Sequence, residues 1–160
     1  MTSPLFTHSP YQVTSTEQGY AFTTDLGERY LIYFSDASGY FDGLDFAHHA
    51  LMVGLARRSG GDPLQHDPRI LATLMQSLEA SLQDVKRVLV YVCDQSDGKQ
   101  EYRHKLFGLW FQRHNAGRFV RHVVAAANGL YASVIYSKSN PFTVELEESL
   151  PELTNKINQS

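Results

Sequence analysis

The chain has 160 residues, of which 42% are hydrophobic, and its 14 basic and 17 acidic side chains give a formal net charge of −3. This length suits one domain that buries its own core, and the apolar content excludes an intrinsically disordered chain. No apolar run approaches the roughly 20 residues that span a bilayer, and a small negative charge gives no general attraction for nucleic acid, so neither a membrane nor a nucleic acid is an expected partner.

The amino-terminal segment and the cysteine content bear on the cellular compartment. Residues 1–10 contain two prolines, show no periodicity, and lack the basic and apolar regions of a secretory signal. They predict a flexible lead-in, so residues 11–160 are expected to form a single domain. The one cysteine, Cys93, excludes an internal disulfide, and without an export signal the expected location is the cytoplasm.

Four strands are predicted in the first third of the chain. Apolar residues alternate with residues of other character in three short runs, which is the period of a half-buried strand. Turns that contain Gly19 and Gly27 join the runs into an antiparallel meander. The runs are Tyr11/Val13, Tyr20/Phe22/Thr24 and Tyr30/Ile32/Phe34. A fourth strand is expected from His48 to Arg57.

The first long helix is predicted to begin at Asp67 and Pro68. Aspartate as the cap followed by proline at the first helical position is a common way for a helix to start. Apolar residues then recur on one face, which is expected to pack on the sheet. They are Ile70, Leu71, Leu74, Met75, Leu78 and Leu82.

The stretch from Lys86 to Phe111 has the strongest pattern in the chain. Residues Val88 to Cys93 are almost uniformly apolar, which suits a central strand covered on both faces. Asp97 and Gln100 have the spacing of a capping box. A second helix is therefore expected to begin directly after this strand.

This second helix carries one charge on its apolar side. On a helical wheel, the centre of the apolar arc is formed by Tyr102, Leu106, Leu109 and Trp110. His104 and Gly108 fall on the opposite side. Arg103 falls within the apolar arc, so we expect it to be buried and to bond to Asp94, Asp97 or a backbone carbonyl.

The chain closes with two strands and a helical segment. The strands are predicted over Phe119–Ala125 and Tyr131–Tyr136, joined by an Asn-Gly turn. A helical segment follows Asn140, and Pro151 is expected to interrupt it. The predicted fold class is α+β: an N-terminal meander followed by β-α-β-α-β-β, with a mixed, mostly antiparallel sheet of about seven strands, two main helices and a C-terminal helical segment.

This order of elements resembles the GNAT N-acetyltransferase superfamily over about residues 28–137. The segments DPRI, YVCDQSDGKQEYRHKLFGLWF and YASVIYSKSNPF are also similar to a small uncharacterised bacterial family of the Bacteroidetes type, whose activity is unknown. The residues that stand out in this second resemblance are Asp94, Asp97, Gly98, Arg103, Phe107 and Trp110.

The acetyltransferase resemblance implies acetyl-CoA as a cofactor, held through its pyrophosphate on a Q/R-x-x-G-x-G/A turn. Arg57, Gly60 and Gly61 match part of that turn, but Asp62 places a carboxylate where phosphate would lie. Six further residues separate the turn from Pro68 and the helix N-terminus that should complete the anion site. The sequence therefore retains only part of the pattern.

Three functional hypotheses remain. The leading one is a non-catalytic binding or regulatory module on a degenerate acetyltransferase-like fold, with no cofactor, no metal, and a protein or small molecule as its partner. The alternatives are an acetyl-CoA-dependent N-acetyltransferase and a carboxylate- or metal-dependent enzyme at Asp94 and Asp97, in which His104 takes part. Cys93 with His104 is weighed as a nucleophilic pair. The candidate ligand-binding residues are Asp94, Ser96, Asp97, Gly98, Lys99 and Arg103, and the basic hairpin around Arg118 and Arg121 is a second candidate surface.

Overall fold

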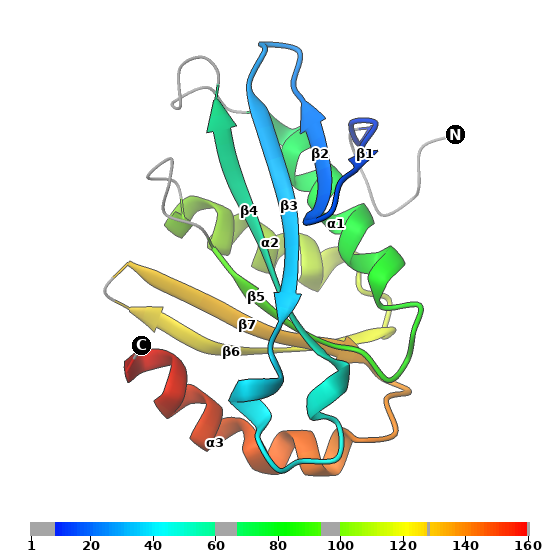
Figure 1. The fold of residues 1–160 in the computed structure, drawn as a ribbon. Helices are drawn as coiled ribbons and strands as arrows, with labels where there is room; N and C mark the ends of the chain where they lie inside the picture. The colour runs from blue at the N-terminus through cyan, green and yellow to red at the C-terminus, as the bar shows by residue number, and fades with distance from the viewer. Residues whose placement is uncertain (1–8, 60–66, 94–99, 128, 160) are drawn as a thin grey trace.

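The computed structural model describes residues 9–59, 67–93, 100–127 and 129–159 (Figure 1). Within them, seven strands form a single sheet in the order β1-β2-β3-β4-β5-β7-β6. The strands are β1 (Thr14–Ser15), β2 (Gly19–Thr23), β3 (Arg29–Asp36), β4 (Ala50–Ser59), β5 (Val88–Val92), β6 (Phe119–Ala127) and β7 (Leu130–Ser137). The helices are α1 (Pro68–Ser81), α2 (Gln100–His114) and α3 (Thr143–Gln159), with short 3-10 turns η1 (Ser38–Phe41) and η2 (Ala47–His49). None of these described helices is long and apolar enough to cross a membrane.

All neighbouring strands pair antiparallel except β4 and β5, which run parallel. A parallel pair needs a crossover connection, and α1 supplies it. The predicted α+β class, with a mixed and mostly antiparallel sheet, is confirmed. The predicted interruption at Pro151 is wrong, because α3 runs through the proline. Leu146 and Leu153, on either side of it, are both buried and hold the helix on the sheet as one piece.

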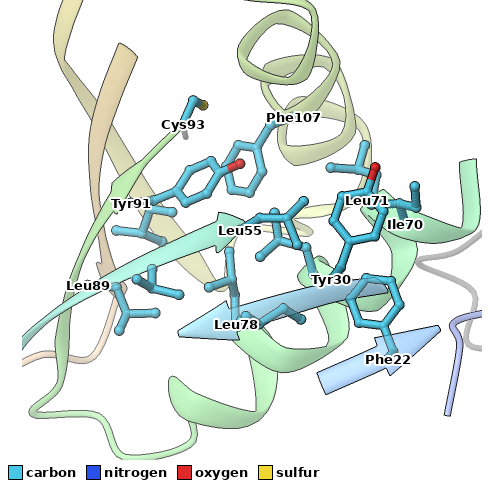
Figure 2. Close-up of a cluster of buried hydrophobic side chains, with 14 of the residues drawn as sticks. Phe22, Tyr30, Leu55, Ile70, Leu71, Leu78, Leu89, Tyr91, Cys93 and Phe107 are labelled. Atoms are coloured by element: carbon cyan, nitrogen blue, oxygen red, sulfur yellow. The ribbon is translucent and has the colours of Figure 1, made fainter. Parts of the chain in front are cut away.

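Helices cover both faces of the sheet (Figure 1). The first core lies beneath α1 and α2, where leucines of α1 and Phe107 of α2 pack against Leu55, Leu89 and Tyr91 (Figure 2). The second core lies beneath α3 on the opposite face. Each fully buried large apolar side chain contributes about 1.5 to 3 kcal/mol relative to exposure, so the two cores together hold the three helices in place.

The segment around Tyr11 ties the beginning of the described chain to α1. The prediction of a strand at Tyr11 is wrong, since β1 contains only Thr14–Ser15. Instead, the backbone N–H of Tyr11 donates to Thr73 Oγ1 at 2.8 Å, and its hydroxyl donates to Asp67. Asp67 also accepts from the backbone N–H of Arg69 at 2.9 Å, which confirms it as the cap of α1. These bonds, rather than strand pairing, fix the segment.

The parallel pair β4 and β5 separates toward its carboxyl end (Figure 1). Their pairing covers Ala50–Gly54 and Val88–Val92, whereas β4 continues beside β3 to Ser59. Gly54 marks the point of separation, and the ring of Tyr33 lies across it: a Cβ on Gly54 would lie 2.2 Å from the Tyr33 hydroxyl oxygen. Among the described residues, no strand pairs with this edge of β4 beyond Gly54.

Candidate functional site

Most residues of the predicted ligand-binding turn lie outside the described part of the chain. These are Asp94, Ser96, Asp97, Gly98 and Lys99, together with Gly60 and Gly61 of the predicted phosphate turn. The roles of these residues, including a metal or acid/base site at Asp94 and Asp97, stay predictions. Arg57 and Arg103 are described and can be placed.

The orientation of α2 differs from the helical-wheel prediction. Phe107 is 1% exposed, whereas Tyr102 and Leu109, predicted at the centre of the buried arc, are 49% and 50% exposed. Apolar residues occupy most of the circumference of this helix, so their spacing does not select one face. The predicted burial of Arg103 is confirmed, at 8% exposure.

Arg121 of β6 reaches beneath α2. Its Nε donates to Ser133 Oγ of β7 at 3.1 Å, and its guanidinium carbon lies 5.2 Å from the ring centre of Phe107. Gly108 gives it room, since a Cβ at that position would lie 3.3 Å from Nη1 of Arg121. The glycine predicted to face away from the core therefore accommodates an arginine side chain.

Two arginines and two weak acids come together under this helix. Tyr91 and Cys93 project from the end of β5 toward α2, with the Tyr91 ring 4.9 Å from that of Phe107 (Figure 2). Both Arg103 and Arg121 lie close enough to act electrostatically on Tyr91 and on Cys93. We call Tyr91, Cys93, Arg103 and Arg121 the arginine cluster.

The two acids of the arginine cluster are neutral at physiological pH. Burial raises the pKa of the Tyr91 phenol well above its ordinary value, with a further rise from Cys93. Burial also raises the pKa of the Cys93 thiol, and the opposing effects of Tyr91 and the two arginines are smaller. A protonated thiol is a poor nucleophile, which argues against a catalytic Cys93. Burial lowers the pKa of Arg121, yet an arginine keeps its charge at pH 7, so the cluster is cationic.

His104 lies at the margin of this cluster and not on the outer face of α2. Its ring centre is 4.8 Å from that of Tyr131 on β7. Burial, and then the charge of Arg121, lower the pKa of its imidazole, so His104 is mostly neutral at pH 7. No group of three or more metal-ligating side chains occurs in the described part of the chain.

Two carboxylates, those of Glu28 and Asp67, lie near the predicted acetyl-CoA phosphate site. Arg57 donates from Nε to Glu28 Oε2 at 3.2 Å, and Glu28 is 1% exposed. At the N-terminus of α1, the Asp67 carboxylate accepts from Arg69 N–H and from Tyr11. Each carboxylate would repel a phosphate at the same place.

The sequence drew attention to Arg121 only as part of a basic hairpin. Its position beneath α2 depends on β7 lying between β5 and β6, and no local pattern signals that order. One feature of β6 points to this position. Side chains two residues apart in a strand lie on the same face, so Arg121 is on the same face as the apolar Phe119.

A model of the family of unknown function DUF6169 matches residues 66–152, which include α1, β5, α2 and the β6–β7 hairpin. The search of curated proteins found no match. Because the family match spans more than half of the 160 residues and contains the whole arginine cluster, this chain belongs to the DUF6169 family of unknown function.

Proposed function

We propose that this protein is a non-catalytic binding module whose arginine cluster holds a small ligand with carboxylate or phosphate groups. The observation that carries the proposal is the environment of Arg121. Its guanidinium is partly buried against Ser133 and the Phe107 ring. No ion pair found among the described residues includes it.

A partly buried cation is costly for a folded protein unless an anion accompanies it. A bound anion would remove that cost, and a guanidinium matches a carboxylate or a phosphate with two parallel hydrogen bonds. Arg103 and Arg121 act on the same buried Tyr91, so both can contribute charge to one ligand. The neutral Tyr91 hydroxyl is a hydrogen-bond donor suited to the same anion.

The protonation states favour binding over catalysis. Burial keeps Cys93 and Tyr91 in their neutral forms by raising the pKa of each. Burial, and then the charge of Arg121, lower the pKa of His104 and favour its neutral form. A nucleophile needs a lowered pKa or an adjacent base that can accept its proton. The raised pKa of Cys93 is the opposite of the first requirement, which supports a role for these groups as donors and packing partners.

Calorimetry with defined anions tests this proposal. Inorganic phosphate, citrate and acetyl-CoA are titrated into the wild-type protein, into Arg121→Gln, and into Arg113→Gln as a control for an exposed arginine of α2. At least one anion should bind to the wild-type protein and to the control, and Arg121→Gln should weaken it about tenfold or more, the value of one charge-assisted hydrogen bond. Binding that is equal in all three proteins, or absent with every anion at millimolar concentration, would overturn the proposal.

The edge of β4 beyond Gly54 favours a second candidate, an acetyl-CoA-dependent N-acetyltransferase. Past Gly54, β4 runs on to Ser59 without β5 beside it. A strand edge left open in this way can pair with the amides of an extended ligand, and the pantetheine arm of acetyl-CoA carries such amides. On this hypothesis, acetyl-CoA should bind with a dissociation constant at or below about 100 µM, and Gly60→Pro should weaken it. Tight binding of acetyl-CoA that Arg121→Gln leaves unchanged would favour this candidate over the first.

A further inference from the structure

The Tyr91 hydroxyl of the arginine cluster is buried without a hydrogen-bond partner. The side chain is 1% exposed, and no described residue forms a hydrogen bond with the hydroxyl oxygen. The neighbouring Cys93 thiol acts on the pKa of the phenol, but sulfur is only a weak acceptor. A buried hydroxyl in this state costs free energy, because folding removes it from water and returns no bond. Its position therefore calls for a partner that the described residues do not supply.

Tyr91 and Arg121 meet at one aromatic ring. The ring centre of Tyr91 lies 4.9 Å from that of Phe107, and the guanidinium carbon of Arg121 lies 5.2 Å from the same centre. Figure 2 shows the Tyr91 hydroxyl beside Phe107, on the side of the sheet that α2 covers. In agreement with these distances, the charge of Arg121 acts on the Tyr91 phenol. An anion held by Arg121 can therefore also accept a hydrogen bond from Tyr91.

The polar groups of this cluster act as donors. The guanidinium groups of Arg103 and Arg121 have no acceptor atom. Ser133 Oγ already accepts from Arg121 Nε at 3.1 Å. The Tyr91 oxygen is able to accept a proton from a ligand, but its own proton would then stay unbonded in a buried place. The cluster thus suits a head group that offers acceptor atoms alone.

We propose that the arginine cluster selects an oxyanion without a proton, namely a carboxylate or a sulfate group, over an oxyanion that carries a hydroxyl, such as inorganic phosphate. At neutral pH a carboxylate offers only acceptor oxygens. Inorganic phosphate keeps at least one proton, which would face guanidinium groups or leave the Tyr91 proton unbonded. Such an unmet buried hydrogen bond corresponds to about tenfold in affinity. The inference rests on the proposed function and goes beyond it by naming the class of head group.

Sulfate and inorganic phosphate make a matched pair of probes. Both ions are tetrahedral, and at mildly alkaline pH both are mainly divalent, so they differ chiefly in the proton that phosphate keeps. Calorimetry under these conditions should show sulfate binding about tenfold more tightly than phosphate. Sulfate that binds no more tightly than phosphate would overturn this inference alone, since an acceptor such as the neutral imidazole of His104 would then serve the site. Absence of binding by every anion, citrate included, would overturn the proposed function and this inference with it.

Two tyrosine variants test the role of the Tyr91 hydroxyl. Tyr91→Phe should weaken sulfate about tenfold without lowering the melting temperature, because the fold loses no hydrogen bond. Tyr136 is the control: it is equally buried, but its hydroxyl lies 3.0 Å from His122 Nε2 and donates to Glu147 Oε2 at 3.3 Å. Tyr136→Phe should therefore lower the melting temperature and leave sulfate affinity unchanged. Unchanged sulfate affinity in Tyr91→Phe would overturn the inference.

Discussion

Arg57 Nε and Glu28 Oε2 lie 3.2 Å apart. The carboxylate of Glu28 is almost wholly buried. The second oxygen of Glu28 accepts no hydrogen bond from the described residues. Arg57→Met should therefore lower the free energy of unfolding by about 3 to 5 kcal/mol, because it leaves a buried charge without its cation. Urea denaturation measures the change.

The neighbouring arginine provides the control for this prediction. Arg58 is exposed on the same strand, and Arg58→Met should change the free energy of unfolding by less than about 0.5 kcal/mol. The double variant Glu28→Gln/Arg57→Met should recover part of the loss, since it removes the charge as well as its partner. Equal effects of the two single variants would contradict a structural role for the Arg57–Glu28 pair.

Arg103→Ala separates a structural arginine from one that serves the ligand. Because Arg103 is 8% exposed, its removal should cost about 3 to 5 kcal/mol of unfolding free energy if it holds a buried partner. Arg113→Ala, an exposed arginine on the same helix, is the control. A variant that keeps the wild-type melting temperature and loses only anion binding would instead make Arg103 a ligand contact.

The elements with local signals were predicted well. Asp67 and Pro68 predict the start of α1, because a cap residue bonds to backbone amides only two or three residues away. The alternating residues of β2 and β3 likewise predict strands, since that period is a property of each strand alone. The expectation that β3 is half-buried is wrong at its centre, because consecutive residues Tyr30, Leu31 and Ile32 are all buried.

The candidate site was harder to predict because it depends on contacts between distant segments. Phe107 and Arg103 are buried against the sheet. Tyr102 and Leu109 are half exposed, although both are apolar. The choice is made by packing against the sheet, where Phe107 meets Tyr91 of β5 and Arg121 of β6. Arg121 reaches Phe107 only because β7 lies between β5 and β6, and no short pattern in the sequence encodes that order.

Alkaline pH should weaken the anchor at Tyr11. Burial, and then the hydrogen bond to Asp67, raise the pKa of its phenol to about 12, compared with about 10 in an unfolded chain. The folded protein thus holds this proton more tightly. The resulting stability is complete below about pH 10 and falls as the pH rises toward about 12, where the unfolded chain has already lost the proton.

Urea midpoints between pH 9 and pH 12 measure this effect. Tyr11→Phe should lower stability by about 1.5 to 3 kcal/mol at pH 8, because the bond to a carboxylate is lost, and should flatten the alkaline decline. Tyr136, whose pKa burial also raises to about 12, should supply the part that remains. Tyr20→Phe, a half-buried ring of β2, is the control and should keep the full decline. An unchanged decline in Tyr11→Phe would contradict the assignment.

We expect Gly108 to lower the stability of α2 and to favour ligand binding at Arg121. A glycine within a helix is destabilising by about 1 kcal/mol relative to alanine, and Gly108 lies in the middle of α2. The added Cβ would meet Nη1 of Arg121 at 3.3 Å, so the guanidinium must move by a few tenths of an ångström. Because this group ends a flexible side chain, the movement is cheap, and Gly108→Ala should be neutral or stabilising by up to about 1 kcal/mol in urea.

The same small movement should be costly for the ligand. Charge-assisted hydrogen bonds depend on the direction of the guanidinium, so Gly108→Ala should weaken phosphate or citrate binding by at least about threefold, or ~0.7 kcal/mol. Gly39→Ala is the matched control, since a Cβ there meets nothing within 4 Å, and it should leave binding unchanged. A Gly108→Ala protein that is more stable yet binds the anion as tightly as wild type would show that the position of Arg121 is set for packing alone. A more stable protein with weaker binding would show that this helix keeps its glycine for the site beneath it.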